Sequence, residues 1–184
     1  MFIIFFIFIS YVYGKDIYIR DYGIINNNNS DYASIVNEQS FRSALNDANY
    51  NDNVILDSNE TIYYLPNIEY PYFNNLSDII INIDGKIILN NNIDIWPMYD
   101  SSKFYNAIDI RYSKNITITG KGYIDGKGYE WWYNFLIGNI PRQRPTIIQF
   151  YNSIDITIEN ISLFNSPRFH IYGDNMLNFI ARNL

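Results

Sequence analysis

Two aspartates and one histidine are the side chains of this sequence that could most readily take part in catalysis. Asp125 lies within an Ile-Asp-Gly segment, and Asp174 stands two residues before Met176. A carboxyl group stays protonated near neutral pH when a second carboxylate close by raises its pKa. The chain has no Asp-Asp pair, and aspartates in turns commonly bond their own backbone. We therefore interpret both as turn residues and predict no catalytic residue in this chain.

His170 is the only histidine, so neither a multi-histidine metal site nor a Ser/His/Asp set can be assigned. We interpret it as a histidine at the surface or at the edge of a repeat, and we predict no metal and no cofactor. Arg142, Arg144 and Arg168 could bind a polyanion through charge-assisted hydrogen bonds. The simpler interpretation is that they are solvated charges on loops.

A glycine cluster is followed closely by a tryptophan pair: Gly120, Gly122, Gly126, Gly128, Trp131 and Trp132. The glycines lack the G-x-G-x-x-G spacing and no helix is predicted after them, which favours tight turns over phosphate binding. The tryptophans could stack on a sugar ring. Because large aromatic side chains gain much from burial, we favour packing in the core or a loop.

The elements that position these side chains are short strands. From Val54 onward, short apolar runs alternate with Asn, Asp and Gly, which is typical of β-structure. Residues 113–120 and 153–160 are near copies, and residues 176–184 partly repeat the second copy with an offset of 23. Such self-similarity indicates a solenoid whose repeats bury a face by stacking. The sequence therefore predicts an all-β, right-handed parallel β-helix.

Side chains alternate along a strand, so Ile116 and Ile118 should point inward and stack on the isoleucines of the next copy, while Thr117 faces outward. One helix is predicted over residues 37–50, with Asn37 as its cap and an apolar face at i, i+3, i+4 and i+7. It should cover one end of the solenoid. Residues 18–22 are predicted as a strand, and residues 129–144 as a loop that leaves the solenoid.

Residues 1–14 have the pattern of a secretory signal peptide. The apolar run of residues 2–9 is far shorter than the roughly 20 residues of a membrane span; a buried strand or an uncleaved anchor are the alternatives. We expect a secreted, extracellular protein with no stable membrane anchor. Residues 15–184 should then form the N-terminal rungs of one β-helix domain.

The composition fits an exported, folded monomer. With 184 residues and 48% hydrophobic content the chain can bury one core. A net charge of -6 without a Lys/Arg run excludes nucleic acid as an expected partner. Cysteine is absent, so stability cannot rest on disulfides. Five sequons are candidate glycosylation sites, although an Asn-rich chain also produces them by chance: Asn28, Asn59, Asn75, Asn115 and Asn160.

Three motifs in order carry a family resemblance. They are residues 120–132 with the glycines and tryptophans, Arg-Pro-Thr-Ile-Ile-Gln-Phe at 144–150, and Asn-Ser-Pro-Arg-Phe at 165–169. Together they resemble the polygalacturonase family of glycoside hydrolases, and Asp-Tyr-Gly at 21–23 and Asp-Gly-Lys-Ile at 84–87 are similar to its earlier segments. The resemblance covers nearly all of the chain after residue 14.

The resemblance implies a secreted β-helix that hydrolyses the α-1,4 links of galacturonan in pectin with inversion, using three aspartates and a supporting histidine without a metal. In the family these residues belong to Asn-Thr-Asp, Asp-Asp, Gly-His-Gly and Arg-Ile-Lys motifs, and none of the four occurs in this chain. Phe169 and Tyr172 also stand where the family often has Trp and His.

We therefore expect a C-terminally incomplete β-helix that is inactive alone and whose partner, if any, is pectin or a related acidic polysaccharide. The alternatives are a non-catalytic β-helix that binds polysaccharide and a truncated gene product.

Overall fold

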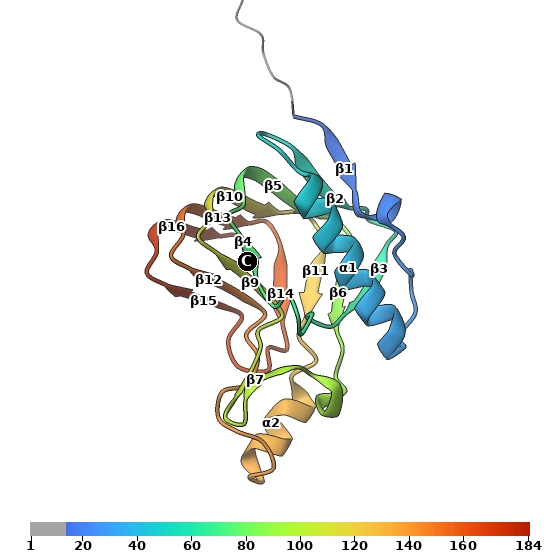
Figure 1. Cartoon of the computed structure of the whole chain (residues 1–184), viewed down its shortest axis with the longest axis vertical. Helices are drawn as coiled ribbons and strands as arrows, with labels where there is room; N and C mark the ends of the chain where they lie inside the picture. Colours follow the sequence, from blue (N-terminus) through green and yellow to red (C-terminus); the bar gives the residue numbers. More distant parts are fainter. Residues whose placement is uncertain (1–13) are drawn as a thin grey trace, which may run out of the picture.

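The computed structural model describes residues 14–184, so the predicted signal peptide lies outside the described residues apart from Gly14. Three parallel sheets form the molecule (Figure 1). The first contains β1 (Asp16–Tyr18), β2 (Asn53–Leu56), β5 (Ser77–Ile83), β10 (Lys114–Thr119), β13 (Ile154–Glu159) and β16 (Leu177–Arg182), in that order. The second contains β14 (Ser162–Phe164), β11 (Tyr123–Asp125), β6 (Lys86–Leu89) and β3 (Thr61–Tyr64). The third contains β15 (Ile171–Asp174), β12 (Ile148–Tyr151), β9 (Ile108–Arg111) and β4 (Phe73–Asn74).

The chain visits these sheets in rotation. From β9 in the third sheet it passes to β10 in the first, β11 in the second and β12 in the third again. Every strand pairing within the three sheets is parallel. Each circuit is thus one rung that stacks on the previous rung, with the right-handed crossover that parallel strands favour. The predicted right-handed parallel β-helix is confirmed.

The core forms by stacking like side chains along the axis. Ile116 and Ile118 of β10 align with Ile156 and Ile158 of β13, and all four are buried. Thr117 lies on the outer face, as predicted. The repeat at an offset of 23 is confirmed by β16, which pairs in parallel with β13. Burying each isoleucine contributes roughly 1.5–3 kcal/mol, so stability comes from these ladders.

Helix α1 (Asp31–Asp47) lies beside β3 at the N-terminal end of the stack (Figure 1). Phe41 packs edge-on against Tyr64 and Phe73, with ring centroids 6.2 and 5.7 Å apart. The prediction that the Phe41 helix covers one end is therefore confirmed.

The predicted start of this helix is wrong. Ser30 is the cap, and its hydroxyl accepts a hydrogen bond from the Ala33 amide at 3.1 Å. Asn37 is buried within the helix, where its side-chain oxygen accepts from the Ile25 amide at 2.7 Å and its amide donates to the Tyr63 carbonyl at 3.0 Å. The polar Asn37 thus ties the helix to two neighbouring segments instead of beginning it.

Two further predictions need correction. Residues 18–22 are only partly strand, since β1 ends at Tyr18 and the 3-10 helix η1 (Ile19–Tyr22) follows. Residues 129–144 are more than a loop, because α2 (Tyr129–Leu136) begins directly after Gly128. The indole of Trp131 anchors α2 in the core, 5.3 Å from the Trp96 ring and 4.9 Å from the Phe104 ring. The short 3-10 helix η2 (Ile93–Ile95) and the antiparallel pair β7 (Met98–Asp100) and β8 (Lys103–Phe104) complete the elements.

The predicted tight turns of the glycine cluster are confirmed where rungs approach most closely. Gly120 has a φ of 134°, and a Cβ there would lie 2.1 Å from the Ile83 carbonyl oxygen. At Gly122 the corresponding distance to the Gly85 carbonyl oxygen would be 1.9 Å. Neither position can accept a side chain without moving the backbone of the adjacent rung.

Candidate functional site

The outer face of the third sheet carries polar and aromatic side chains. Along β9 and β12, Ile108, Ile110, Ile148 and Phe150 point into the core. The positions between them place Asp109 beside Gln149 and Arg111 beside Tyr151 in the sheet register. In β15 the same two rows continue as Tyr172 and Asp174. The alternation of a half-buried strand therefore builds a continuous polar surface along the axis.

Asp109 and Arg111 form the centre of this surface. The Arg111 Nε donates to Asp109 Oδ1 at 2.8 Å, and its Nη2 donates to Oδ2 at 3.0 Å. Burial opposes the charge on Arg111, but the bonds to Asp109 outweigh it and raise the pKa of the guanidinium. The guanidinium also lies 3.4 Å from the Tyr72 ring centroid. Asp109 is thus held as the partner of a fixed cation.

Asn106 connects this pair to the next rung. Its side-chain amide donates to Asp109 Oδ2 at 3.0 Å and to Gln149 Oε1 at 2.8 Å. Its side-chain oxygen accepts from the Thr146 amide at 3.0 Å. These bonds fix the orientation of the Gln149 amide, so that the amide is already oriented before a ligand binds.

A cavity of about 210 Å³ adjoins Gln149, and we call it the basic cavity. Its lining comprises Lys103, Phe104, Asn106, Gln143, Arg144, Gln149, Arg168, Tyr172 and Asp174. Three of these side chains are cationic and one is anionic. Among the described residues, none of the three cations forms an ion pair within 4 Å of a carboxylate. Arg168 instead donates to the neutral Gln143 side chain. The basic cavity therefore has an excess of positive charge.

Arg144 is the most deeply placed of these cations, with 4% of its surface exposed. Its Nε donates to the Pro167 carbonyl at 2.8 Å, and its guanidinium lies 4.2 Å from the Trp132 ring and 4.0 Å from the Phe135 ring. Its Nη1 is buried and has no hydrogen-bond partner in the part of the chain that the structure describes. Burial, together with repulsion from Arg168 and Arg142, lowers the pKa of Arg144. The interpretation of Arg144 as a solvated loop charge is wrong. Arg142 is exposed, as predicted, and Arg168 is half-buried.

The two aspartates considered from the sequence lie on different sheets. Asp125 ends β11 in the second sheet, where Oδ1 accepts from the Lys127 amide and from Asn165 Nδ2, both at 3.0 Å. Burial would raise the pKa of Asp125, but the bonds to Lys127 and Asn165 lower it overall. Asp125 is therefore an ionised turn residue, as predicted. Asp174 ends β15 directly before the bend at Asn175, as predicted for a residue that begins a turn before Met176, and it also lines the basic cavity.

The histidine and the tryptophans are also separated. His170 is exposed just before β15, as predicted for a histidine at a repeat edge. Trp131 is a core residue, whereas Trp132 is partly exposed beside Arg144 and donates from Nε1 to the Ser166 carbonyl at 3.0 Å. Within residues 14–184 no group of three or more His, Cys, Asp or Glu side chains could hold a metal ion.

Sequence reasoning missed Lys103, Arg111 and Gln149. The signal for Arg111 and Gln149 was present, because Ile-Asp-Ile-Arg and Ile-Gln-Phe-Tyr alternate apolar and polar residues with period two. Lys103 belongs to the β7–β8 hairpin, and its approach to the third sheet depends on a long-range contact between the hairpin and residue 143.

Residues 71–184 match the model of the glycosyl hydrolases family 28. A probable polygalacturonase of Vitis vinifera is 30% identical over 107 residues, which cover 51% of this chain and 22% of the relative. A polygalacturonase of Cryptomeria japonica is 34% identical over 101 residues, covering 50% and 18%. The matched part thus spans about a fifth of the length of these relatives.

Among solved structures, a hyperthermoactive exopolygalacturonase from Thermotoga maritima superposes with a TM-score of 0.70 at 17% identity, covering 91% of this chain and 46% of that chain. A putative glycosyl hydrolase from Parabacteroides merdae superposes with a TM-score of 0.60 at 16% identity, covering 91% and 74%. These likenesses support the β-helical fold. The family match extends over more than half of the sequence, and this chain therefore belongs to the glycosyl hydrolases family 28.

Proposed function

We propose that this chain supplies N-terminal rungs and part of the substrate cleft of a secreted enzyme that hydrolyses α-1,4 galacturonan links in pectin. The observation that carries the proposal is the basic cavity on the outer face of the third sheet. Its excess positive charge fits a polysaccharide in which each unesterified residue bears a carboxylate. Family membership and relatives named as polygalacturonases support the same substrate class.

The chemistry of the cavity suits a uronate. Arginine and lysine donate charge-assisted hydrogen bonds to carboxylates, and arginine can do so with two parallel bonds. Arg168 and Lys103 would bind the carboxylate, while the oriented amide of Gln149 would accept from or donate to sugar hydroxyls. The buried charge of Arg144 adds a favourable potential without solvent screening.

The same residues do not make a hydrolytic centre. Inverting hydrolysis needs an acid and a base roughly 6.5–9.5 Å apart across the sugar. Asp109 is bonded to Arg111, and Asp125 is bonded to Lys127 in the second sheet. We propose that hydrolysis requires residues outside this sequence and that the chain alone binds without cleaving.

Export is part of the proposal. Residues 1–14 would be removed as a signal peptide, leaving residues 15–184 as one β-helix domain that begins at Lys15 and acts as a monomer. The candidate glycosylation sites Asn28 and Asn59 are exposed and lie outside the described helices and strands. None of the described helices is long and apolar enough to cross a membrane. N-terminal sequencing of the exported chain checks the cleavage site.

Binding of unesterified oligogalacturonate to the purified chain, measured by calorimetry, tests the proposed function. Arg168→Gln should weaken binding about tenfold or more, because a hydrogen bond to a charged group contributes roughly 1.5–3 kcal/mol. Lys114→Gln is the matched control, since Lys114 is an exposed cation on the first sheet. Equal losses in both variants, or no binding at all, would contradict the proposal.

A further inference from the structure

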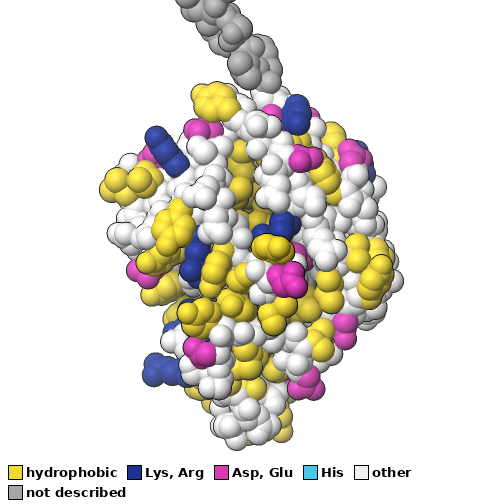
Figure 2. Space-filling model, in the orientation of Figure 1, with side chains coloured by type: hydrophobic (Ala, Val, Ile, Leu, Met, Phe, Trp, Pro, Cys, Tyr) yellow, Lys and Arg dark blue, Asp and Glu magenta, His cyan; other side chains and the backbone are white. Residues whose placement is uncertain are grey.

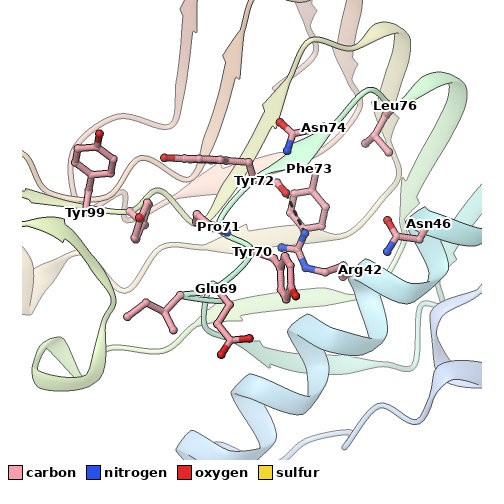
Figure 3. A pocket seen from close by; sticks show the side chains of 12 residues that line it. Arg42, Asn46, Glu69, Tyr70, Pro71, Tyr72, Phe73, Asn74, Leu76 and Tyr99 are labelled. Carbon is pink, nitrogen blue, oxygen red and sulfur yellow. Dashed lines mark hydrogen bonds between the residues drawn. The ribbon is translucent and has the colours of Figure 1, made fainter.

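A second recess of about 660 Å³ opens at the N-terminal edge of the third sheet. Four tyrosines line it, and we call it the tyrosine groove: Tyr70, Tyr72, Tyr99 and Tyr105. Figure 3 shows Tyr70 on the α1 side of the recess and Tyr99 on the opposite side, with Tyr72 between them. Tyr70 and Tyr99 are 63% and 60% exposed. In Figure 2 hydrophobic side chains gather across the same face, between α1 and β7.

Three of the four rings, those of Tyr72, Tyr99 and Tyr105, contact one another. The Tyr105 ring lies 5.9 Å from the Tyr72 ring and 5.8 Å from the Tyr99 ring, both in edge-on geometry. Tyr72 is fixed in addition by the Arg111 guanidinium on its face. An array of preoriented aromatic rings loses little side-chain entropy on binding and offers apolar faces to a flat ligand.

Among the described residues, the lining of the tyrosine groove itself contains no unpaired cation, although Nζ of the free cation Lys103 in the basic cavity lies 5.7 Å from the Tyr99 ring centroid. The charged residues of its lining are Arg42 and Glu69. The Arg42 guanidinium is bonded to Glu38, donates from Nη1 to the Tyr72 carbonyl at 3.0 Å, and lies 4.2 Å from the Phe73 ring. Glu69 is exposed. A free uronate carboxylate would therefore meet an exposed carboxylate and a cation that is already neutralised.

The groove and the basic cavity lie along one surface. The β7–β8 hairpin region contributes Tyr99 and Tyr105 to the groove, and Lys103 and Phe104 to the basic cavity. Between them, Arg111 contacts the rings of both Tyr72 and Tyr151. The edge strands β4 and β15 are three ladder steps apart, which is roughly 14 Å. One oligosaccharide can span both recesses.

We propose that the tyrosine groove binds uncharged, methyl-esterified galacturonate residues of the same polysaccharide whose free carboxylates occupy the basic cavity. The proposal rests on the proposed function and refines its substrate to partly esterified pectin. Esterification removes the charge that Glu69 would repel and adds a methyl group that gains from contact with the tyrosine rings. The two ends of the surface thus select opposite states of the substrate.

Calorimetric titration of the purified chain with oligogalacturonates of equal length, one fully methyl-esterified and one unesterified, tests this inference. Tyr70→Ala and Tyr99→Ala should each weaken binding of the esterified ligand about tenfold. Tyr70→Ala should leave binding of the unesterified ligand unchanged, whereas Tyr99→Ala also removes the ring against which Lys103 lies. Tyr99→Phe should bind as the unaltered chain does, because the ring face and not the hydroxyl makes the contact. Tyr129→Ala, at a tyrosine 78% exposed on α2, is the matched control. Circular dichroism and thermal unfolding confirm that each variant is folded.

The outcomes separate the two proposals. The inference would be overturned if the unesterified ligand bound through Arg168 while binding of the esterified ligand did not change in Tyr70→Ala or Tyr99→Ala. The proposed function would then remain intact. If binding of the esterified ligand depends on Tyr70 and Tyr99 and the unesterified ligand does not bind, the result supports the inferred role of the tyrosine groove. It contradicts the proposed role of the basic cavity. Equal weakening of both ligands by Tyr70→Ala would also overturn the inference, as would failure of the esterified ligand to bind.

Discussion

The Arg111 guanidinium makes a two-point contact with the buried carboxylate of Asp109, with bonds of 2.8 and 3.0 Å. The same guanidinium lies against the Tyr72 ring, so one ion pair joins the middle of the third sheet to the tyrosine groove. Asp109 is among the most buried carboxylates of the described chain. It is unsuited to catalysis because both of its oxygens accept hydrogen bonds from Arg111. Its role is to position Arg111.

Replacing Arg111 by Met should therefore destabilise the protein strongly. The change leaves Asp109 as a buried charge without its partner, which costs about 3–5 kcal/mol. Denaturant unfolding measures the loss. Arg182→Met removes an exposed partner of Glu159 and should change stability by less than about 1 kcal/mol. Similar small effects in both variants would show that Asp109 is not held by Arg111.

Ser30→Ala should reduce the free energy of unfolding by about 1 kcal/mol, because the Ala33 amide loses its capping bond. Asn37→Ala should cost more, since it leaves the Ile25 amide and the Tyr63 carbonyl without their partner. Asn29→Ala, just outside the helix and exposed, is the control. If Ser30→Ala had no effect while Asn29→Ala did, the assigned start of α1 would be wrong.

The sequence predicted the solenoid because its signal is local and repeated. Ile116 and Ile118 recur as Ile156 and Ile158 at matching positions, and period two alone sets which side of the strand is buried. The start of α1 was missed because Asn37 has the chemistry of a cap, and only its contacts with Ile25 and Tyr63 reveal a buried bridge. The basic cavity was missed because long-range contacts assemble it: rung stacking brings Arg144 and Arg168 together, and the β7–β8 hairpin brings Lys103 to them through residue 143.

Asparagines in left-handed turns should be sensitive to alanine. Asn152 has a φ of 49° in the turn after β12, and its side-chain oxygen accepts a hydrogen bond from Asn175 in the next rung. Asn152→Ala should cost roughly 1–2 kcal/mol of backbone strain in addition to that bond. Asn152→Gly loses the bond without the strain and should be the milder change in thermal unfolding. Equal losses for Ala and Gly would assign the effect to the side chain alone.

Glu38 should make stability depend on mildly acidic pH. Burial raises the pKa of Glu38, and the bonds to Arg42 only partly offset this. The folded state then takes up a proton at a higher pH than the unfolded chain, in which the pKa is about 4.3. The contribution of Glu38 to stability is full below that unfolded value and is lost as pH rises through the raised folded value.

The measurement compares the unaltered chain with Glu38→Gln from pH 7 to pH 4. The unaltered chain should gain stability relative to the variant as pH falls. Carboxylates with lowered pKa values, such as Asp125, act in the opposite direction, but they are common to both proteins and cancel in the difference. A difference in stability that stays constant, or that shifts in favour of the variant as pH falls, would contradict the assignment to Glu38.

The purified chain should not cleave polygalacturonate above a buffer blank. A general acid must be protonated at the working pH, whereas the bonds from Lys127 and Asn165 lower the pKa of Asp125 and keep it ionised. Asp109 is occupied by Arg111, and Asp174 is the one carboxylate that lines the basic cavity. No second carboxylate of that lining can act as its partner across a sugar at the roughly 6.5–9.5 Å that inversion requires.

A reducing-end assay measures turnover, and release of sugar that disappears in Asp174→Asn or Asp125→Asn would overturn this prediction. Retained binding of oligogalacturonate by the same inactive sample shows that the cleft is formed and that only the reacting groups are lacking.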